Sequence, residues 1–219
     1  MCRLTQCIIM TLAAFISGAV MYSYLIPLVL FRVNIVKISA DKNPGCSNVI
    51  RSVGLVTGIV CMVLDVLKAF LPVFIAVKFI GLSGFYLVPV AAAPVLGHAF
   101  SPMLKFKGGK AVSTAYGVLL GLLPLTIFVI VPALFMAFFR FVVVIRPDSY
   151  GVAVSMAGVS AFALIFVPEL WLKAIVITIS AVMIYKLLKH PDKGTFSIGT
   201  LHHIVKIEDK RLVFVKYET

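Results

Sequence analysis

The sequence predicts an all-α integral membrane protein with about seven transmembrane helices. Apolar residues make up 62% of the chain, charged residues only 13%, and the mean hydropathy is +1.12. An average soluble domain carries about 25% charged residues, and a spanning helix needs roughly 20 mainly apolar residues in a row. Long apolar runs with short polar breaks fill most of the 219 residues. The composition therefore excludes an ordinary soluble domain.

Each apolar run is a candidate membrane span. The first begins at Cys7 and is too long for the core of a cleaved signal peptide, which has about 7 to 15 residues, so we expect it to remain as the first helix. The fourth run is short, and Pro124 separates it from the fifth. The expected spans cover residues 7–31, 54–80, 84–100, 111–123, 125–140, 150–167 and 170–188.

Lysine and arginine residues concentrate on one side of these spans. Segments 32–52, 101–111, 140–148 and the tail from Lys186 hold most of the 20 Lys and Arg residues. The positive-inside rule therefore predicts a multi-pass protein of the inner (plasma) membrane, with its N-terminus outside and its C-terminus in the cytoplasm. The net charge of +12 follows from loops beside anionic lipid. We expect membrane lipid as a partner and no nucleic acid.

The four cysteines indicate neither a disulfide framework nor a metal centre. Cys2, Cys7, Cys46 and Cys61 are irregularly spaced and lack a partnering histidine or cysteine pattern. We expect no metal site.

The segment from Gly97 to Lys110 is the most informative motif. It sets three lysines and the pair Gly108-Gly109 between two apolar runs. Adjacent glycines let the backbone approach an anion, and a helix beginning near Ala111 would direct unpaired N–H groups at the same place. The motif predicts a phosphate-binding loop at a membrane surface. His98 is open to two interpretations, a contact to substrate or a hydrogen bond to the backbone.

A second polar loop precedes the second expected span. Asn-Pro-Gly at 43–45 favours a tight turn, Asn48 can donate to oxygen, and Arg51 offers a planar fork that suits phosphate. A plain polar connector fits equally well. Asp65 and Lys68 lie three residues apart on one helical face, which favours either an internal ion pair or a role for Lys68 in holding a substrate anion.

These motifs in this order resemble a known family. Asn-Pro-Gly-x-x-Asn-x-x-Arg, then Asp-x-x-Lys, then Gly-His-x-Phe-x-Pro-x-x-x-Phe-Lys-Gly-Gly-Lys are similar to the bacterial PlsY-type membrane glycerol-3-phosphate acyltransferases, over residues 10–200. The resemblance implies a seven-helix fold with its motif loops on the cytoplasmic side. It also implies transfer of a fatty acyl group from acyl phosphate to the 1-hydroxyl of glycerol 3-phosphate, giving lysophosphatidic acid for phospholipid synthesis. Neither coenzyme A nor a metal is required, so no cofactor is expected.

The resemblance also implies a set of site residues. His98, Asn48 and Lys110 are the catalytic candidates, and Arg140 and His190 match parts of a third motif. The candidates for binding substrate phosphate are Asn43, Gly45, Arg51, Lys68, Lys107, Gly108, Gly109 and Lys110.

Four positions depart from the family pattern. Asp41 and Val143 stand where the family has serine, Lys193 replaces an asparagine and Leu201 replaces a glutamate; Ser149 lies too far along to replace the second serine without a register change. An anion at position 41 should repel a phosphate unless Lys42 or Arg51 compensates. Three explanations fit: a divergent enzyme of the same reaction, a transferase for another phosphorylated alcohol, or a non-catalytic relative that binds phosphate or lipid.

The chain divides into a seven-helix domain, residues 1–200, and a tail, residues 201–219. Within the tail, two β-favouring runs at 204–207 and 212–217 flank a polar turn, which predicts a small β-hairpin. An isolated hairpin is marginal in water. It should therefore cover the phosphate pocket or dock an enzyme that produces acyl phosphate.

Overall fold

The computed structural model describes residues 1–200, 203–208 and 211–216. Leu201, one of the four departures, lies outside the described residues. The chain is mostly helical, as predicted. Its helices are α1 (Arg3–Ala19), α2 (Tyr22–Phe31), α3 (Ile35–Ile38), α4 (Cys46–Ser52), α5 (Leu55–Lys78), α6 (Leu87–Ala99), α7 (Val112–Gly121), α8 (Ile130–Ala137), α9 (Asp148–Phe166) and α10 (Leu170–Lys189).

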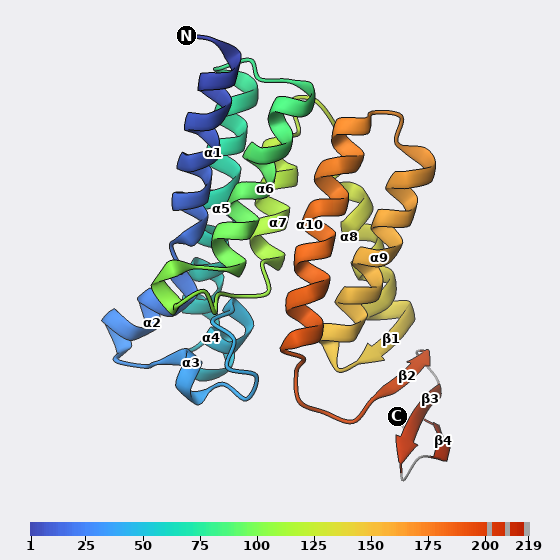
Figure 1. Ribbon diagram of the computed structural model, residues 1–219. Helices are drawn as coiled ribbons and strands as arrows, with labels where there is room; N and C mark the ends of the chain where they lie inside the picture. Colours follow the sequence, from blue (N-terminus) through green and yellow to red (C-terminus); the bar gives the residue numbers. More distant parts are fainter. Residues whose placement is uncertain (201–202, 209–210, 217–219) are drawn as a thin grey trace.

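Helices α1, α5, α6, α7, α8, α9 and α10 run alternately between the two ends of a bundle (Figure 1). The N-terminus lies at one end. The α6–α7 connection, α3, α4 and the strands lie at the other end. Within the described residues, four helical segments are long and apolar enough to cross a membrane: Leu55–Lys78, Gly84–Leu104, Asp148–Phe166 and Leu170–Lys189. The bent pair α1 and α2 makes a fifth if it counts as one span.

The structure confirms the all-α membrane class but shortens two of the seven expected spans. The runs at 111–123 and 125–140 correspond to α7 and to a short apolar helical segment, Ile130–Val142. Helix α7 ends at Gly121 and a turn-rich segment containing Pro124 follows, because proline lacks the N–H that would continue a helix. Segment Ile130–Val142 ends in a π-helical turn, Phe138–Val142.

The first apolar run is interrupted near Val20. Helices α1 and α2 are bent by 41° at this break, so the run is not one straight helix. The break leaves backbone carbonyls without helical partners. The Ser101 hydroxyl donates to the Ala19 carbonyl at 2.6 Å, and the Lys68 ammonium donates to the Val20 carbonyl. The break is thereby tied to α5 and to the α6–α7 connection.

Small residues let the central helices pack closely. A side chain added at Gly117 in α7 would meet the Val66 carbonyl of α5, and one at Gly97 in α6 would meet the Phe15 carbonyl of α1. Glycine is needed at both positions because the neighbouring backbone occupies the space of a Cβ atom. These contacts hold α7 against α5 and α6 against α1.

The tail forms the predicted hairpin, within a larger sheet. Strands β3 (His203–Glu208) and β4 (Arg211–Lys216) pair in antiparallel register, Glu208 opposite Arg211. The sequence did not indicate the other two strands, β1 (Val143–Arg146) and β2 (Ser197–Thr200), which complete a four-stranded antiparallel sheet in the order β1-β2-β3-β4. Because β1 directly follows the π-helical turn, the sheet anchors the tail to the bundle.

Candidate active site

The first motif loop surrounds a buried asparagine. Asn48 lies in the first turn of α4, is 7% exposed, and donates through Nδ2 to Asp41 Oδ1 and to the Asn43 carbonyl, both at 2.8 Å. The Asn43 N–H donates to the same Asp41 oxygen at 3.2 Å. Asn48 therefore holds the loop in place through the carboxylate of Asp41. Gly45 caps α4, and the exposed Arg51 lies in its last turn.

The diglycine of the second motif loop packs against His98. The Gly109 N–H donates to the His98 carbonyl at 3.1 Å. A Cβ atom at Gly108 would collide with that carbonyl, and one at Gly109 would collide with Nε2 of the His98 ring. Both glycines are buried, and the loop also needs left-handed backbone at Lys105, Phe106 and Ala111. Close packing against α6 therefore requires the glycine pair.

Lys110 is turned inward and binds two carboxylates. Its Nζ lies 2.8 Å from Asp41 Oδ2 and 2.7 Å from Asp192 Oδ1, and it donates to Ser149 Oγ at 3.0 Å. Ser149 Oγ donates to Asp192 Oδ2 at 2.7 Å and accepts from the Asp192 N–H at 3.0 Å. Four segments that are far apart in sequence meet at this one ammonium group.

A second charged network lies within the helices. Lys68 Nζ is 2.7 Å from Asp65 Oδ1 and 2.9 Å from His98 Nδ1. The Lys68–Asp65 contact is an ion pair without hydrogen-bond alignment, so Asp65 Oδ1 accepts no hydrogen bond from the described residues. Asp65 Oδ2 accepts a hydrogen bond from the Ser23 hydroxyl at 2.9 Å. An ammonium group can only donate, so His98 Nδ1 accepts and the ring proton sits on Nε2, beside Gly109.

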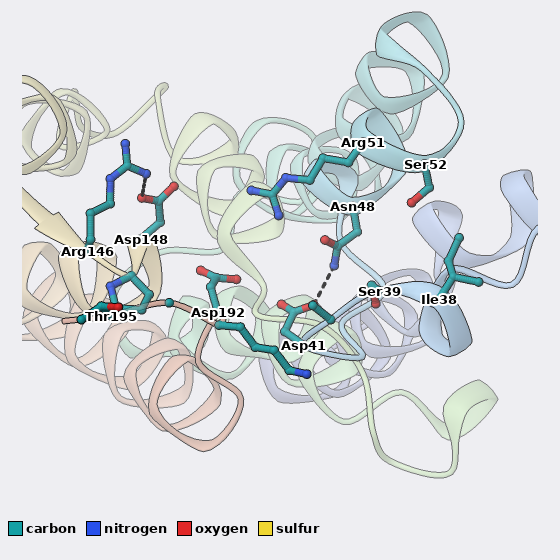
Figure 2. Close-up of a pocket in the computed structure, with 14 residues that line it drawn as sticks. Ile38, Ser39, Asp41, Asn48, Arg51, Ser52, Arg146, Asp148, Asp192 and Thr195 are labelled. Carbon is teal, nitrogen blue, oxygen red and sulfur yellow. Dashed lines mark hydrogen bonds and ion pairs between the residues drawn. The ribbon is translucent and has the colours of Figure 1, made fainter. Parts of the chain in front are cut away.

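Two cavities adjoin the Lys110 cluster. The smaller, about 400 Å³, is lined mostly by polar and charged residues, among them Arg51, Arg146, Lys193, Ser39 and Thr195. The larger, about 630 Å³, is lined by Lys110 and His98 and by many apolar side chains, including Met62, Val66, Met136 and Leu187. Asp41, Asn48, Arg51, Asp148 and Asp192 line both cavities. Figure 2 shows the carboxylates of Asp41 and Asp192 beside the smaller cavity, together with the guanidinium of Arg51.

Several site residues predicted from the sequence lie away from the Lys110 cluster and its cavities. Lys107 is exposed, and neither it nor Lys68, Gly108 or Gly109 lines either cavity. Arg140 lines the larger cavity and pairs with Asp148 at 2.7 Å. His190 caps the end of α10 and lines neither cavity.

Sequence reasoning missed Asp192 and set Ser149 aside. Val143, where the resemblance expects a serine, lies in β1, whereas Ser149 in the first turn of α9 reaches Lys110. Asp192 follows the third-motif histidine by two residues and precedes Lys193, which is exposed. A charged residue beside a recognised motif histidine was the available signal. The pairing of Asp192 with Lys110 was visible only in the structure.

Three titratable groups outside the membrane spans have pKa values shifted by their surroundings. Partial burial raises the pKa of the Asp192 carboxyl, but hydrogen bonds from Lys110 and Ser149 outweigh burial, so the pKa lies below its ordinary value. Burial and the neighbouring Lys186 and Lys189 lower the pKa of His190, which favours its neutral form. Burial raises the pKa of the Cys46 thiol, so this cavity-lining cysteine is protonated at neutral pH and is a poor nucleophile.

Among the described residues, no group of three or more His, Cys, Asp or Glu side chains is arranged to hold a metal ion. The cluster offers instead an ammonium, a guanidinium, amides and hydroxyls beside a mainly apolar cavity. Such groups can bind an oxyanion and neutralise charge.

Comparisons with known proteins agree with this chemistry. The family model described as glycerol-3-phosphate acyltransferase matches residues 8–194. A glycerol-3-phosphate acyltransferase of Thermotoga petrophila is 43% identical over 102 residues, 47% of this chain and 51% of the relative. One of Leptospira borgpetersenii is 41% identical over 142 residues, 61% of this chain and 58% of the relative. These matches span little more than half the length of either relative.

Two solved structures share the fold. The crystal structure of PlsY, an integral membrane glycerol 3-phosphate acyltransferase, in its glycerol 3-phosphate form has a TM-score of 0.72 and 26% identity, and covers 84% of this chain and 89% of that one. The lysophosphatidic acid form has a TM-score of 0.70 and 25% identity, and covers 87% of this chain and 95% of that one.

Proposed function

The chain belongs to the glycerol-3-phosphate acyltransferase family, and we propose that it transfers a fatty acyl group from acyl phosphate to the 1-hydroxyl of glycerol 3-phosphate, giving lysophosphatidic acid. One observation carries the proposal: the motif lysine, Lys110, lines a large and mainly apolar cavity, and its partners Asp41 and Asp192 line both that cavity and a smaller one with many polar side chains. Two substrates of opposite character need such a junction. The solved PlsY forms with glycerol 3-phosphate and lysophosphatidic acid support the same reading.

In this proposal the apolar cavity holds the acyl chain, and Arg51 and Lys110 hold phosphate where the cavities meet. The glycerol hydroxyl oxygen attacks the acyl carbon, the bond from that carbon to the phosphate oxygen breaks, and phosphate leaves with its electron pair. Substrate phosphate accepts the hydroxyl proton. Acyl phosphate is already activated, so alignment and charge neutralisation are the main contributions asked of the protein.

Other motif residues act by positioning in this scheme. Asn48 keeps the first loop in place by its two hydrogen bonds, and His98 supports the diglycine through its carbonyl and ring. Asn43 and Gly45 shape the turn that presents Asp41 and Arg51 to both cavities. Arg140 lines the larger cavity, and its pair with Asp148 holds the guanidinium in place there.

We further propose the inner (plasma) membrane orientation that the charge distribution predicts, with the N-terminus outside and the C-terminus in the cytoplasm. The site then faces the compartment that supplies glycerol 3-phosphate. In this orientation the sheet that ends in β3 and β4 lies on the cytoplasmic side, where an enzyme that produces acyl phosphate could dock.

The test is acyl transfer by the purified protein in detergent, from palmitoyl phosphate to labelled glycerol 3-phosphate. We expect lysophosphatidic acid from the wild type, and a rise in KM for glycerol 3-phosphate of about tenfold in Arg51→Gln, the size of one lost charge-assisted contact. No carboxylate among the described residues pairs with Arg51, so this variant should fold.

Lys110→Ala, checked for folding by its thermal transition, should lose product formation. The same assay should include a panel of other phosphorylated alcohols, because the Asp41 carboxylate on Lys110 is the feature that favours a different acceptor. Product from another alcohol alone would replace the acceptor in the proposal. A folded wild type that makes no product from any of them would overturn the catalytic proposal and favour a binding relative.

A further inference from the structure

The ammonium group of Lys110 has no free N–H. A lysine has three donors, and all three are used, by Asp41 Oδ2 at 2.8 Å, Asp192 Oδ1 at 2.7 Å and Ser149 Oγ at 3.0 Å. The side chain of Lys110 is 11% exposed and that of Asp41 5%. A substrate whose oxygens bind Lys110 must therefore displace one or more of these partners.

Both carboxylates are held by further hydrogen bonds on their far oxygens. Asp41 Oδ1 accepts from Asn48 Nδ2 and the Asn43 N–H. Asp192 Oδ2 accepts from the Ser149 hydroxyl at 2.7 Å and the Ser149 N–H at 3.1 Å. An exposed surface pair lacks such support. We call the three residues Asp41, Lys110 and Asp192 the latch, because they join three loops across one ammonium.

The latch lies between the two cavities. Asp41 and Asp192 line both, while Lys110 lines only the larger one. Figure 2 shows these two carboxylates among the residues that line the smaller cavity, with Asn48 bonded to Asp41. With the latch closed, its carboxylates form part of the wall that separates the polar space from the apolar one. A substrate that displaces them would join the two spaces.

We propose that Asp41 and Asp192 are internal substitutes for the substrate phosphate, and that they make the site select a doubly charged phosphomonoester. This inference rests on the proposed function. The two carboxylates together bring a formal charge of −2 to Lys110. A monoanion cannot replace that charge, whereas a phosphomonoester dianion can, and it also offers several acceptor oxygens.

Position 41 is one of the four positions where this chain departs from the family pattern that its motifs resemble. A serine there could donate a hydrogen bond to phosphate, whereas the Asp41 carboxylate competes with phosphate for the same cation. Aspartate in place of serine would make acceptor binding weaker but more selective for a doubly charged acceptor. Specificity of this kind comes from a penalty on the wrong ligand as well as from contacts to the right one.

The first experiment measures binding without turnover. Thermal stabilisation of the purified protein is followed at pH 8 with inorganic phosphate, mainly a dianion there, and with dimethyl phosphate, a monoanion. We expect phosphate to stabilise the wild type and dimethyl phosphate to have no effect. Asp41→Asn keeps the shape and removes one charge, so it should bind phosphate at least threefold more tightly and should begin to respond to dimethyl phosphate.

The matched control is Glu169→Gln, which removes one negative charge at the exposed start of α10, at the opposite end of that helix from Asp192. It should behave as the wild type. Asp192→Asn is the second latch variant, and it should shift selectivity in the same direction if Asp41→Asn fails to fold. Equal responses to the two anions in the wild type, unchanged selectivity in the latch variants, or no stabilisation by phosphate would each overturn the inference.

A turnover assay separates this inference from the proposed function. In Asp41→Asn, KM for glycerol 3-phosphate should fall at least threefold while Glu169→Gln leaves it unchanged. If the wild type binds phosphate selectively and makes no product, the latch stands and the acyltransferase proposal fails. If product forms but KM rises or stays constant in Asp41→Asn, the latch fails and the acyltransferase proposal stands.

Discussion

Two lysines of this protein bind carboxylates at similar distances, in very different settings. Lys68 pairs at 2.7 Å with Asp65, three residues away on the same helix, and is 4% exposed. Lys110 pairs with Asp41 and Asp192, which are 69 and 82 residues away in the chain, beside two cavities. The difference teaches that charge alone does not mark a functional lysine. Asp65 reaches the larger cavity, but Lys68 lines neither cavity and is enclosed by its helix, His98 and the Val20 carbonyl. The pairs of Lys110 join separate loops where both cavities meet, so a substrate can take the place of a carboxylate there.

The two networks meet at His98. Its ring accepts from Lys68, while its carbonyl accepts from the N–H of Gly109, the residue before Lys110. The buried network therefore supports the loop that carries the exchangeable one. Changes in the first should affect folding, and changes in the second should affect substrate binding.

The largest effect is expected for Lys68→Met. The substitution leaves the Asp65 carboxylate buried without its cation, which costs about 3 to 5 kcal/mol in a folded protein. Thermal or chaotrope unfolding in detergent would measure the loss. The double variant Asp65→Leu/Lys68→Met removes both charges and should recover at least half of it. If Lys68→Met kept full stability but lost phosphate binding, Lys68 would be a substrate ligand and the contrast between the two lysines would disappear.

The next largest effect is expected for Gly109→Ala, where the two networks meet at His98. The added methyl would collide with Nε2 of His98, and such overpacking costs about 1 to 3 kcal/mol. Displacement of the loop that carries Lys110 should also lower kcat/KM by about 100-fold, the scale seen when reacting groups are misplaced by about 1 Å. The control is Ala161→Gly, at an exposed position of α9 outside both cavities, which costs about 1 kcal/mol of helix stability without touching the loop. Equal activity in the two variants would show that His98 does not position the loop.

Much of this contrast could be predicted from the sequence. The Asp65-x-x-Lys68 spacing indicates an ion pair because residues three apart share a helical face, and the apolar runs predict the helices that bury it. The hairpin followed from two β-favouring runs around a polar turn. Local spacing and periodicity carry this kind of information.

The partners of Lys110 could not be predicted in the same way. Ser149 and Asp192 reach it only because β1 and the end of α10 bring their loops to one place. The short α7 could be predicted from a short apolar run that ends before Pro124, whereas the π-helical turn at Phe138–Val142 had no signal in the sequence. Contacts between segments distant in sequence depend on packing that no local pattern encodes.

A smaller effect on stability is expected when the pH is lowered. The pKa of Asp192 is lowered in the folded protein, so its carboxylate contributes stability that is fully present above the unfolded pKa, about 3.9, and is lost as pH falls through the lower folded value. The gap in thermal midpoint between the wild type and Asp192→Asn should therefore be constant at neutral pH and narrow below about pH 4. A gap that stays constant to pH 3 would show that the carboxylate charge does not stabilise the latch.

The smallest effect is expected from the exposed ion pair of Arg146 with Asp148. Both side chains are at least one-third exposed, and Asp148 keeps a second partner in Arg140, so Arg146→Gln should cost less than about 1 kcal/mol of stability. Arg146 also lines the polar cavity, but its charge is already partly neutralised by Asp148, unlike that of Arg51. The KM for glycerol 3-phosphate should accordingly rise less in Arg146→Gln than in Arg51→Gln, measured side by side at one ionic strength. The reverse order would place the phosphate nearer to β1 than to α4, and would move acceptor binding away from the latch.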